Sequence, residues 1–236
     1  MAYSNSFRRW ELKFMLSVEQ YCAIRSEMEK YMCGDKYGES DICNLYCDTP
    51  DFLLVRRSIE KPFYKEKLRM RSYGVAKKGS DIFLEIKKKY DSVVYKRRIA
   101  TDETTAADIL SAKTVIGSQI GNEISYFAKL YPGIEPRMFI SYRREAFYGI
   151  RDKNFRITFD RSIRWRTCDL SLSSGVYGQS VLSDDRILME VKTTTAIPLW
   201  LVKILSSNKV YKTSFSKYGT AYGMMLKNKK GEQEVA

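Results

Sequence analysis

Lysines, arginines and glutamates recur at every second position in several segments of the sequence. In KEKLRMRSYG, residues 65–74, the cations Lys67, Arg69 and Arg71 alternate with Leu68 and Met70. Successive side chains of a β-strand point to opposite faces, so these three cations share one face of any strand. The paired N–H donors of a guanidinium suit two phosphate oxygens, and a carboxylate among cations suits Mg²⁺ or Mn²⁺. A face of this composition would suit phosphate groups held together with a divalent metal ion, and the charged face of a half-buried sheet shows the same alternation.

The same two-residue period groups charged residues in other segments. Residues that share a face in this way are Glu11 with Lys13, Glu85 with Lys87 and Lys89, Lys96 with Arg98, Tyr142 with Arg144, and Glu190 with Lys192. For any single strand, the solvated face of a half-buried sheet explains the pattern. Across the set, however, cations far outnumber anions, which a solvated face does not require. If the sheet closes into a barrel with these faces inward, the converging charges need a polyanion to neutralise them.

Composition limits the chemistry further. The chain of 236 residues has 41 lysines and arginines against 28 aspartates and glutamates, a formal charge of +13, which indicates an anionic partner such as nucleic acid, phosphates or a lipid surface. It contains no histidine, which excludes a Ser/His/Asp triad, a Cys/His pair and any imidazole base. Carboxylates, cations and metals are left to carry the chemistry.

The cysteines and the apolar segments bear on location. Five cysteines, an odd number without a CxxC pair, indicate neither a zinc site nor a disulfide framework, and they fit a reducing cytoplasm. The most apolar stretch, AIPLWLVKIL at 196–205, has about half of the ~20 residues that span a bilayer. We therefore expect a soluble, cytoplasmic protein with no transmembrane segment in this chain.

Alternation with a period of two predicts a largely antiparallel sheet. The predicted strands are residues 8–16, 42–48, 64–74, 81–90, 92–100, 137–149, 155–163, 186–194 and 213–225. Helices are predicted at 18–32, where Ser17 and Gln20 form a capping box, at 50–58 after an N-cap at Thr49, at 104–131 as one or two helices, and at 196–207. We expect a single domain at 1–226 and a polar, disordered tail at 227–236.

Seven motifs carry a resemblance to a known family: LYCDTPDF, KLRMRSYG, FLEIKKKYDSVVYKRR, SYRREAFYG, FRITFD, ILMEVK and FSKY. In this order and spacing they closely resemble the polyphosphate polymerase domain of the vacuolar transporter chaperone (VTC) family, within the CYTH-like triphosphate tunnel metalloenzymes. The resemblance covers nearly the whole chain. It implies an α+β fold with a closed eight-stranded antiparallel β-barrel, helices packed outside it, and a tunnel lined with lysine and arginine.

The resemblance also implies roles for individual residues. The implied catalytic residues are Arg69, Arg71, Lys87, Arg144 and Lys217; the implied substrate-binding residues are Lys13, Lys67, Lys96, Tyr142, Arg156, Lys192 and Ser216; and Glu190 is the implied ligand of Mn²⁺ or Mg²⁺. Each has a plainer reading as well, the arginines and Glu190 in ordinary ion pairs and Tyr142 in packing. Four cations match no motif position and are expected on a solvated face: Lys89, Arg97, Arg98 and Arg143.

The first strand departs from the pattern of hydrolytic relatives. These typically carry ExExK, whose carboxylates help to hold metal and activate water, whereas the stretch here reads Arg9, Glu11, Lys13. A cation in place of a glutamate repels a metal and removes a base, which weakens the hypothesis of a hydrolase. The effect depends on register, because a slip of one residue turns Arg9 outward.

Together these observations favour an ATP-dependent polyphosphate polymerase that transfers the γ-phosphate of ATP to a growing chain inside a basic tunnel. Two alternatives stay open: a metal-dependent triphosphatase or tripolyphosphatase of the same fold, and a non-catalytic polyphosphate-binding sensor. The expected partners are ATP and inorganic polyphosphate, and a membrane partner protein stays open. A nucleic acid is not expected, because YDSVVYKRR lacks the spaced aromatic platforms on which single-strand binders stack bases.

Overall fold

The computed structural model describes residues 10–77, 79–91, 93–114 and 116–234. One antiparallel sheet dominates it, in the order β1-β9-β7-β6-β2-β3-β4-β5. Its strands are β1 (Trp10–Leu16), β2 (Met32–Asp48), β3 (Tyr64–Tyr73), β4 (Ile82–Tyr90), β5 (Val93–Thr101), β6 (Glu135–Gly149), β7 (Arg156–Arg166) and β9 (Ile187–Thr193), and the short β8 (Gln179–Ser180) pairs with β7. The eight strands predicted between residues 8 and 194 are thus confirmed, although β2 begins ten residues earlier than expected.

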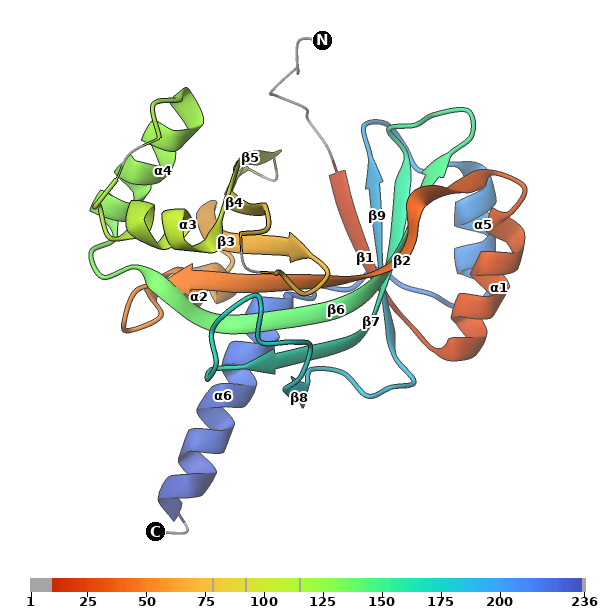
Figure 1. Ribbon diagram of the computed structural model, residues 1–236. Coiled ribbons are helices and arrows are strands. Elements are labelled where there is room, and N and C mark those ends of the chain that lie inside the picture. Colours follow the sequence, from red (N-terminus) through yellow and green to blue (C-terminus); the bar gives the residue numbers. More distant parts are fainter. Residues whose placement is uncertain (1–9, 78, 92, 115, 235–236) are drawn as a thin grey trace.

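The described residues form six helices outside the sheet (Figure 1): α1 (Val18–Met28), α2 (Leu53–Ile59), α3 (Glu103–Leu110), α4 (Gln119–Leu130), α5 (Leu199–Ser207) and α6 (Lys217–Glu234). The capping box of α1 is confirmed, because the Gln20 amide donates to Ser17 Oγ and the Ser17 amide donates to Gln20 Oε1. Helices α3 and α4 pack beside β3–β5, whereas α1 and α5 lie together beside β1 and β9.

The predicted closed barrel is wrong, because β1 and β5 are the two free edges of the sheet and do not pair. Residues that precede α6 occupy the free side of β1: the Thr213 amide donates to Lys13 O (2.8 Å), and Phe14 forms a bridge with Lys212. The sheet curves so that a side chain of β4, the strand next to the edge strand β5, reaches β1: Lys87 Nζ lies 3.2 Å from Glu11 Oε2. Strand periodicity reports which residues share a face, but not whether the edges join.

The strand predicted at 213–225 is also wrong, because α6 begins within it. Ser216 caps this helix: its carbonyl accepts from the Thr220 amide and its Oγ accepts from the Gly219 amide. The buried residues of this part of the helix are Tyr218, Ala221, Tyr222 and Met225, a spacing of i, i+3, i+4 and i+7. The helix continues to Glu234, so residues 227–234 of the predicted tail are helical, whereas the domain boundary at 226 stays a prediction.

A buried carboxylate fixes α2 and α6 against the sheet. Asp48, fully buried at the end of β2, accepts from the backbone amides of Leu54 and Val55 and from the hydroxyl of Tyr218. The Tyr218 ring also stacks on Tyr46 of β2, with centroids 4.5 Å apart. These contacts hold the beginning of α6 at a fixed place beneath the sheet. No helix among the described residues is long and apolar enough to cross a membrane.

Candidate functional site

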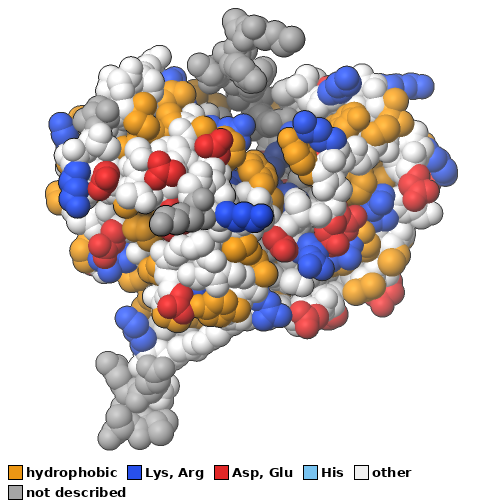
Figure 2. Space-filling view, viewed as in Figure 1, with side chains coloured by type: hydrophobic (Ala, Val, Ile, Leu, Met, Phe, Trp, Pro, Cys, Tyr) orange, Lys and Arg blue, Asp and Glu red, His pale blue; other side chains and the backbone are white. Residues whose placement is uncertain are grey.

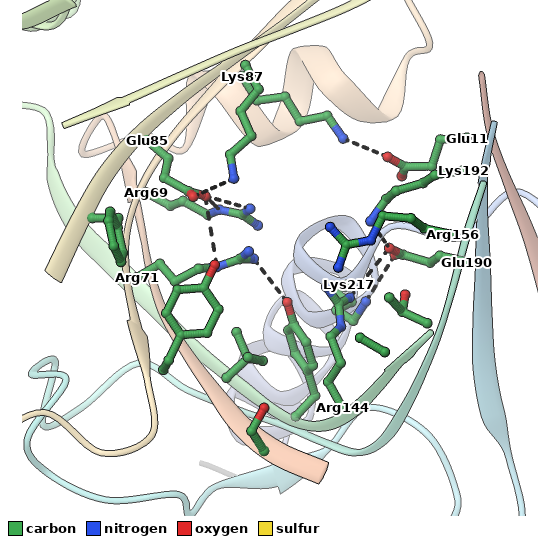
Figure 3. Close-up of a pocket in the computed structure, with 18 of the residues that line it drawn as sticks. Glu11, Arg69, Arg71, Glu85, Lys87, Arg144, Arg156, Glu190, Lys192 and Lys217 are labelled. Atoms are coloured by element: carbon green, nitrogen blue, oxygen red, sulfur yellow. Dashed lines mark hydrogen bonds and ion pairs between the residues drawn. The ribbon is translucent and has the colours of Figure 1, made fainter. Parts of the chain in front are cut away.

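The concave face of the sheet encloses a cavity of about 1030 Å³. Lysine and arginine side chains gather around the hollow in the surface (Figure 2), and the labelled residues project into it from opposite walls (Figure 3). All thirteen residues predicted for the site line this cavity: Lys13, Lys67, Arg69, Arg71, Lys87, Lys96, Tyr142, Arg144, Arg156, Glu190, Lys192, Ser216 and Lys217. The structure therefore places all of these residues around one cavity, whereas their individual roles stay predictions.

Glu85 gathers the cations of one wall. Its carboxylate is almost fully buried on β4 and lies 2.8 Å from Arg69, 2.5 Å from Lys96 and 3.9 Å from Arg71. Burial opposes the charge of Glu85, but the three cations outweigh burial and hold its pKa well below the ordinary value. Arg71 is fixed further, because it donates to Asn44 Oδ1 (2.8 Å). The guanidinium groups are therefore preorganised before any ligand binds.

A second buried network forms the opposite wall and the floor. Arg144 of β6 donates two hydrogen bonds to Asp160 of β7, at 2.6 and 2.7 Å. Lys217, at the first position of α6, lies 2.5 Å from Asp160 and 3.2 Å from Glu190 of β9. Burial opposes its charge, but the two carboxylates outweigh burial and raise the pKa of Lys217. The first turn of α6 thus places a cation among side chains of β6, β7 and β9.

The cavity carries more positive than negative charge. Its lining includes eleven lysines and arginines, the ten among the residues already named and Arg98, against five acids: Glu11, Asp35, Asp41, Glu85 and Glu190. The surplus acts on neutral groups too, because neighbouring cations outweigh burial and lower the pKa of Tyr46 and of Tyr142. A cavity of this kind attracts a compact polyanion.

Lys67 is a part-buried lining cation without a carboxylate partner among the described residues. Among the described residues it has no carboxylate within ion-pair distance, and its Nζ donates only to Ser216 Oγ (3.2 Å). Burial, reinforced by Lys87, Lys13 and Lys65, lowers its pKa to about 8. Burial likewise lowers the pKa of Lys192 to about 8, even though Glu190 lies 3.5 Å away. An anionic ligand that bound here would stabilise the protonated form of both lysines.

We therefore expect anion binding to weaken as the pH rises from 7 to 9.5, and to be accompanied by proton uptake near pH 8. Lys67 and Lys192 lose their protons in the free protein above pH 8, and a bound anion restores them. For folding, the sign is opposite: the unfolded chain binds more protons between about pH 8 and 10.5, so these two groups make the free protein more stable as the pH rises.

Titration calorimetry with tripolyphosphate, in two buffers of different ionisation enthalpy, measures this proton uptake. The variant Lys67→Arg keeps its charge at all these pH values. It should therefore take up fewer protons than the wild type and retain more affinity at pH 9.5. Comparison of the two proteins cancels the titration of the ligand itself. Equal proton uptake by both would show that Lys67 does not sense the anion.

Two carboxylates of the cavity offer oxygen ligands to a metal. Glu190 Oε1 and Glu11 Oε1 lie 3.6 and 3.7 Å from the same Lys13 Nζ. Across the described ranges, however, no group of three or more His, Cys, Asp or Glu side chains is placed to hold a metal. Lysines and arginines also surround Glu190. The pair fits Mg²⁺ or Mn²⁺ only in a set that phosphate oxygens and water complete, which is the common form of an Mg²⁺ site.

Sequence reasoning left several residues of the site without a role. The sequence did contain evidence for three of them. Glu11 and Glu85 each share a strand face with a lysine that was assigned to the site, and Asp160 lies four positions after the assigned Arg156 in FRITFD, on the same strand face. Arg98, expected on a solvated face, is exposed but lines the cavity, with its guanidinium carbon 4.4 Å from the centre of the Phe83 ring. The predicted role of Arg9 lies outside the described residues.

Several solved structures share the fold of this chain. The solved structures that are similar include a putative adenylate cyclase from Bacillus halodurans, with 13% identity, a TM-score of 0.57, and coverage of 90% of this chain and 95% of that one. A putative adenylate cyclase from Vibrio parahaemolyticus has 14% identity, a TM-score of 0.52, and coverage of 92% and 99%. A putative adenylyl cyclase from Hippeastrum, described as having a dominant triphosphatase activity, has 14% identity, a TM-score of 0.53, and coverage of 88% and 92%.

At these identities the solved structures show a shared fold alone. No curated protein matches the sequence. The model of the VTC domain family, in contrast, matches residues 8–226, nearly the whole chain. The resemblance predicted from the seven motifs is thus confirmed, and the chain belongs to the VTC domain family.

Proposed function

We propose that the protein is an ATP-dependent polyphosphate polymerase, which works in the cavity of the curved sheet. The observation that carries this proposal is the cavity itself, where eleven cations face one another in a chain of the VTC domain family. Many of these cations are held by buried carboxylates, so their positions are set in advance and a phosphate chain need not order them. The substrates are ATP and the growing chain of inorganic polyphosphate.

In the proposed reaction, Arg69 and Arg71 hold the triphosphate of ATP, with Lys87, Arg144 and Lys217 around it. A terminal oxygen of the bound chain attacks the γ-phosphorus in line and forms a new P–O bond. The bond from the γ-phosphorus to the β,γ-bridging oxygen breaks, and ADP leaves with that electron pair. The protein contributes position and neutralisation of charge, and it need not supply a covalent nucleophile.

The acids of the site support chain transfer over hydrolysis. A general base for water requires a carboxylate whose pKa is close to the working pH. Cations instead outweigh burial and lower the pKa of Glu11 to about 2, and they hold the pKa of Asp160 and of Glu190 below their ordinary values. The chain contains no histidine that could take this role. The terminal oxygen of a polyphosphate is already anionic and needs no such base.

The proposed reaction also requires a divalent metal ion, and Glu190 and Glu11 would be its protein ligands. When bound with the phosphates, Mg²⁺ or Mn²⁺ would neutralise charge on their oxygens. A triphosphatase is the second candidate, since one protein of the same fold is described with that activity. The two candidates share the substrate and differ in which nucleophile reaches the γ-phosphorus.

We expect Glu190→Gln to separate binding from turnover. The substitution removes one negative charge from beside Lys13, Arg144, Lys192 and Lys217. Tripolyphosphate should therefore bind as tightly as to the wild type or more tightly. Metal-dependent release of ADP from ATP should be lost, because the amide keeps the shape of the side chain but loses the charge that attracts a hard cation.

The experiment measures tripolyphosphate affinity by calorimetry, and ADP release across a Mn²⁺ titration. Glu123→Gln is a matched control, because Glu123 of α4 pairs with Arg97 on the outer face of the sheet. The control should match the wild type in both assays. Equal ADP release by wild type and Glu190→Gln at every Mn²⁺ concentration would reduce Glu190 to a structural ion pair.

A further inference from the structure

The wall formed by β3 and β4 changes its chemistry from one end to the other. Lys67, Arg69, Arg71 and Tyr73 occupy successive cavity-facing positions of β3. On β4, Lys87 pairs with Lys67, whereas Phe83 pairs with Arg71. The wall is thus basic at the Lys67 end and becomes aromatic just beyond Arg71.

Aromatic faces and one guanidinium gather at this second end. The rings of Tyr73 and Phe83 meet edge to face, with centroids 5.8 Å apart. Arg98 of β5 lies over the Phe83 ring at 4.4 Å and makes no ion pair among the described residues. Tyr73 is 58% exposed, although it also lines the cavity. A single exposed tyrosine needs no explanation, but here the exposed ring is part of the lining of the basic cavity.

The opposite end continues the basic wall. By register, Lys65 lies opposite Lys89, one alternation beyond the pair of Lys67 and Lys87 and on the same face. Among the described residues neither Lys65 nor Lys89 has an acidic partner within ion-pair distance; Lys65 Nζ donates to Ser58 O at 3.3 Å. This end therefore suits a continuing chain of phosphates. The lining residue Tyr46, opposite Arg69, is buried and stacks on Tyr218, so its ring is not exposed for a base.

We infer that Tyr73, Phe83 and Arg98 form a subsite for the base of a nucleoside triphosphate. The inference rests on the proposed function for the identity of the ligand. Tyr73 follows Arg71 by two residues, which span about 6.8 Å along a strand. A triphosphate on Arg69 and Arg71 therefore presents its nucleoside at the aromatic end, where stacking and a neighbouring guanidinium stabilise a base. The polyphosphate chain then lies toward Lys67, Lys65 and Lys89.

The test is a comparison of ATP with tripolyphosphate, which lacks the nucleoside, as calorimetric ligands. Tyr73→Ala should weaken ATP binding by roughly 5- to 160-fold, the contribution expected from stacking of one base, and should leave tripolyphosphate binding unchanged. Tyr73→Phe keeps the ring and should bind both ligands as the wild type does. Tyr90→Ala is the matched control, because Tyr90 is a comparably exposed tyrosine on the opposite face of β4 and does not line the cavity.

The outcomes separate this inference from the proposed function. If the wild type binds both ligands and Tyr73→Ala loses affinity for neither, or for both alike, the base subsite is wrong while the phosphate site stands. If Tyr90→Ala loses ATP affinity as Tyr73→Ala does, the effect is not local and the subsite is again wrong. If the wild type binds neither ligand, the proposed function fails and the base subsite fails with it.

Discussion

Replacement of Lys217 by methionine will lower the free energy of unfolding by about 3–5 kcal/mol, the cost of leaving a buried charge without its partner. Lys217 Nζ lies 2.5 Å from Asp160 and 3.2 Å from Glu190, and both carboxylates are buried. Without the ammonium group, Asp160 keeps Arg144 as its ion-pair partner, while Glu190 keeps Lys13, Arg144 and Lys192 at 3.5–3.6 Å. Methionine keeps most of the length of the side chain, so the loss of stability comes from the missing charge and not from a new cavity.

Thermal unfolding measures this prediction, and the midpoint should fall by roughly 6–20 °C for a chain of this size. Lys227→Met provides the control, because it removes the same group from an exposed position of the same helix. Substitutions at such positions change stability by about 0.5 kcal/mol or less. A loss in Lys217→Met no larger than in Lys227→Met would mean that the ammonium group does not compensate the two buried carboxylates.

Replacement of Arg69 by alanine will weaken ATP binding by roughly 10- to 100-fold, the value of one charge-assisted fork to phosphate. The fold should survive, because Glu85 keeps Lys96 at 2.5 Å and Arg71 at 3.9 Å. Loss of one cation also relieves the repulsion within the lining. We therefore expect Arg69→Ala to lose ATP affinity without a large loss of folding stability, whereas Lys217→Met should lose folding stability.

Calorimetry with ATP measures the affinity, and the thermal midpoint measured alongside it checks the fold. Arg97→Ala is the matched control: Arg97 is also a sheet arginine in an ion pair, but its partner is Glu123 of α4 on the outer face. It should bind ATP as the wild type does. Unchanged ATP affinity in Arg69→Ala would contradict the assignment of this wall to the triphosphate.

Local periodicity predicted which charged residues share a strand face, and the family resemblance supplied the prediction that this face points inward. The inward residues of β3 and β9 follow from strict alternation, since a side chain's face depends only on its position in the strand. The motif FSKY placed Ser216 and Lys217 in the site as well, even though the segment that contains them was predicted as a strand. The helical spacing of Tyr218, Ala221, Tyr222 and Met225 was present in the sequence, but alternating small and aromatic residues at 213–225 also fit a period of two.

The features that periodicity does not determine are long-range ones. Whether β1 meets β5 depends on what covers β1, here residues 212 and 213, which lie about 200 positions away in the chain. The pairing of Lys217 with Asp160 and Glu190 depends on three separate elements meeting in space. Alternation on one strand carries no information about either. The family resemblance supplied the direction of the cationic face, but it also supplied the closed barrel that the structure contradicts.

The central claim is that the cavity joins phosphates into a chain. The most direct measurement incubates the purified protein with ATP and Mn²⁺ or Mg²⁺ and resolves the products by gel electrophoresis beside an assay for ADP and orthophosphate. The account predicts long polyphosphate together with ADP, and orthophosphate only as a minor product. Orthophosphate and ADP with no polymer on the gel would contradict it and identify the protein as a triphosphatase.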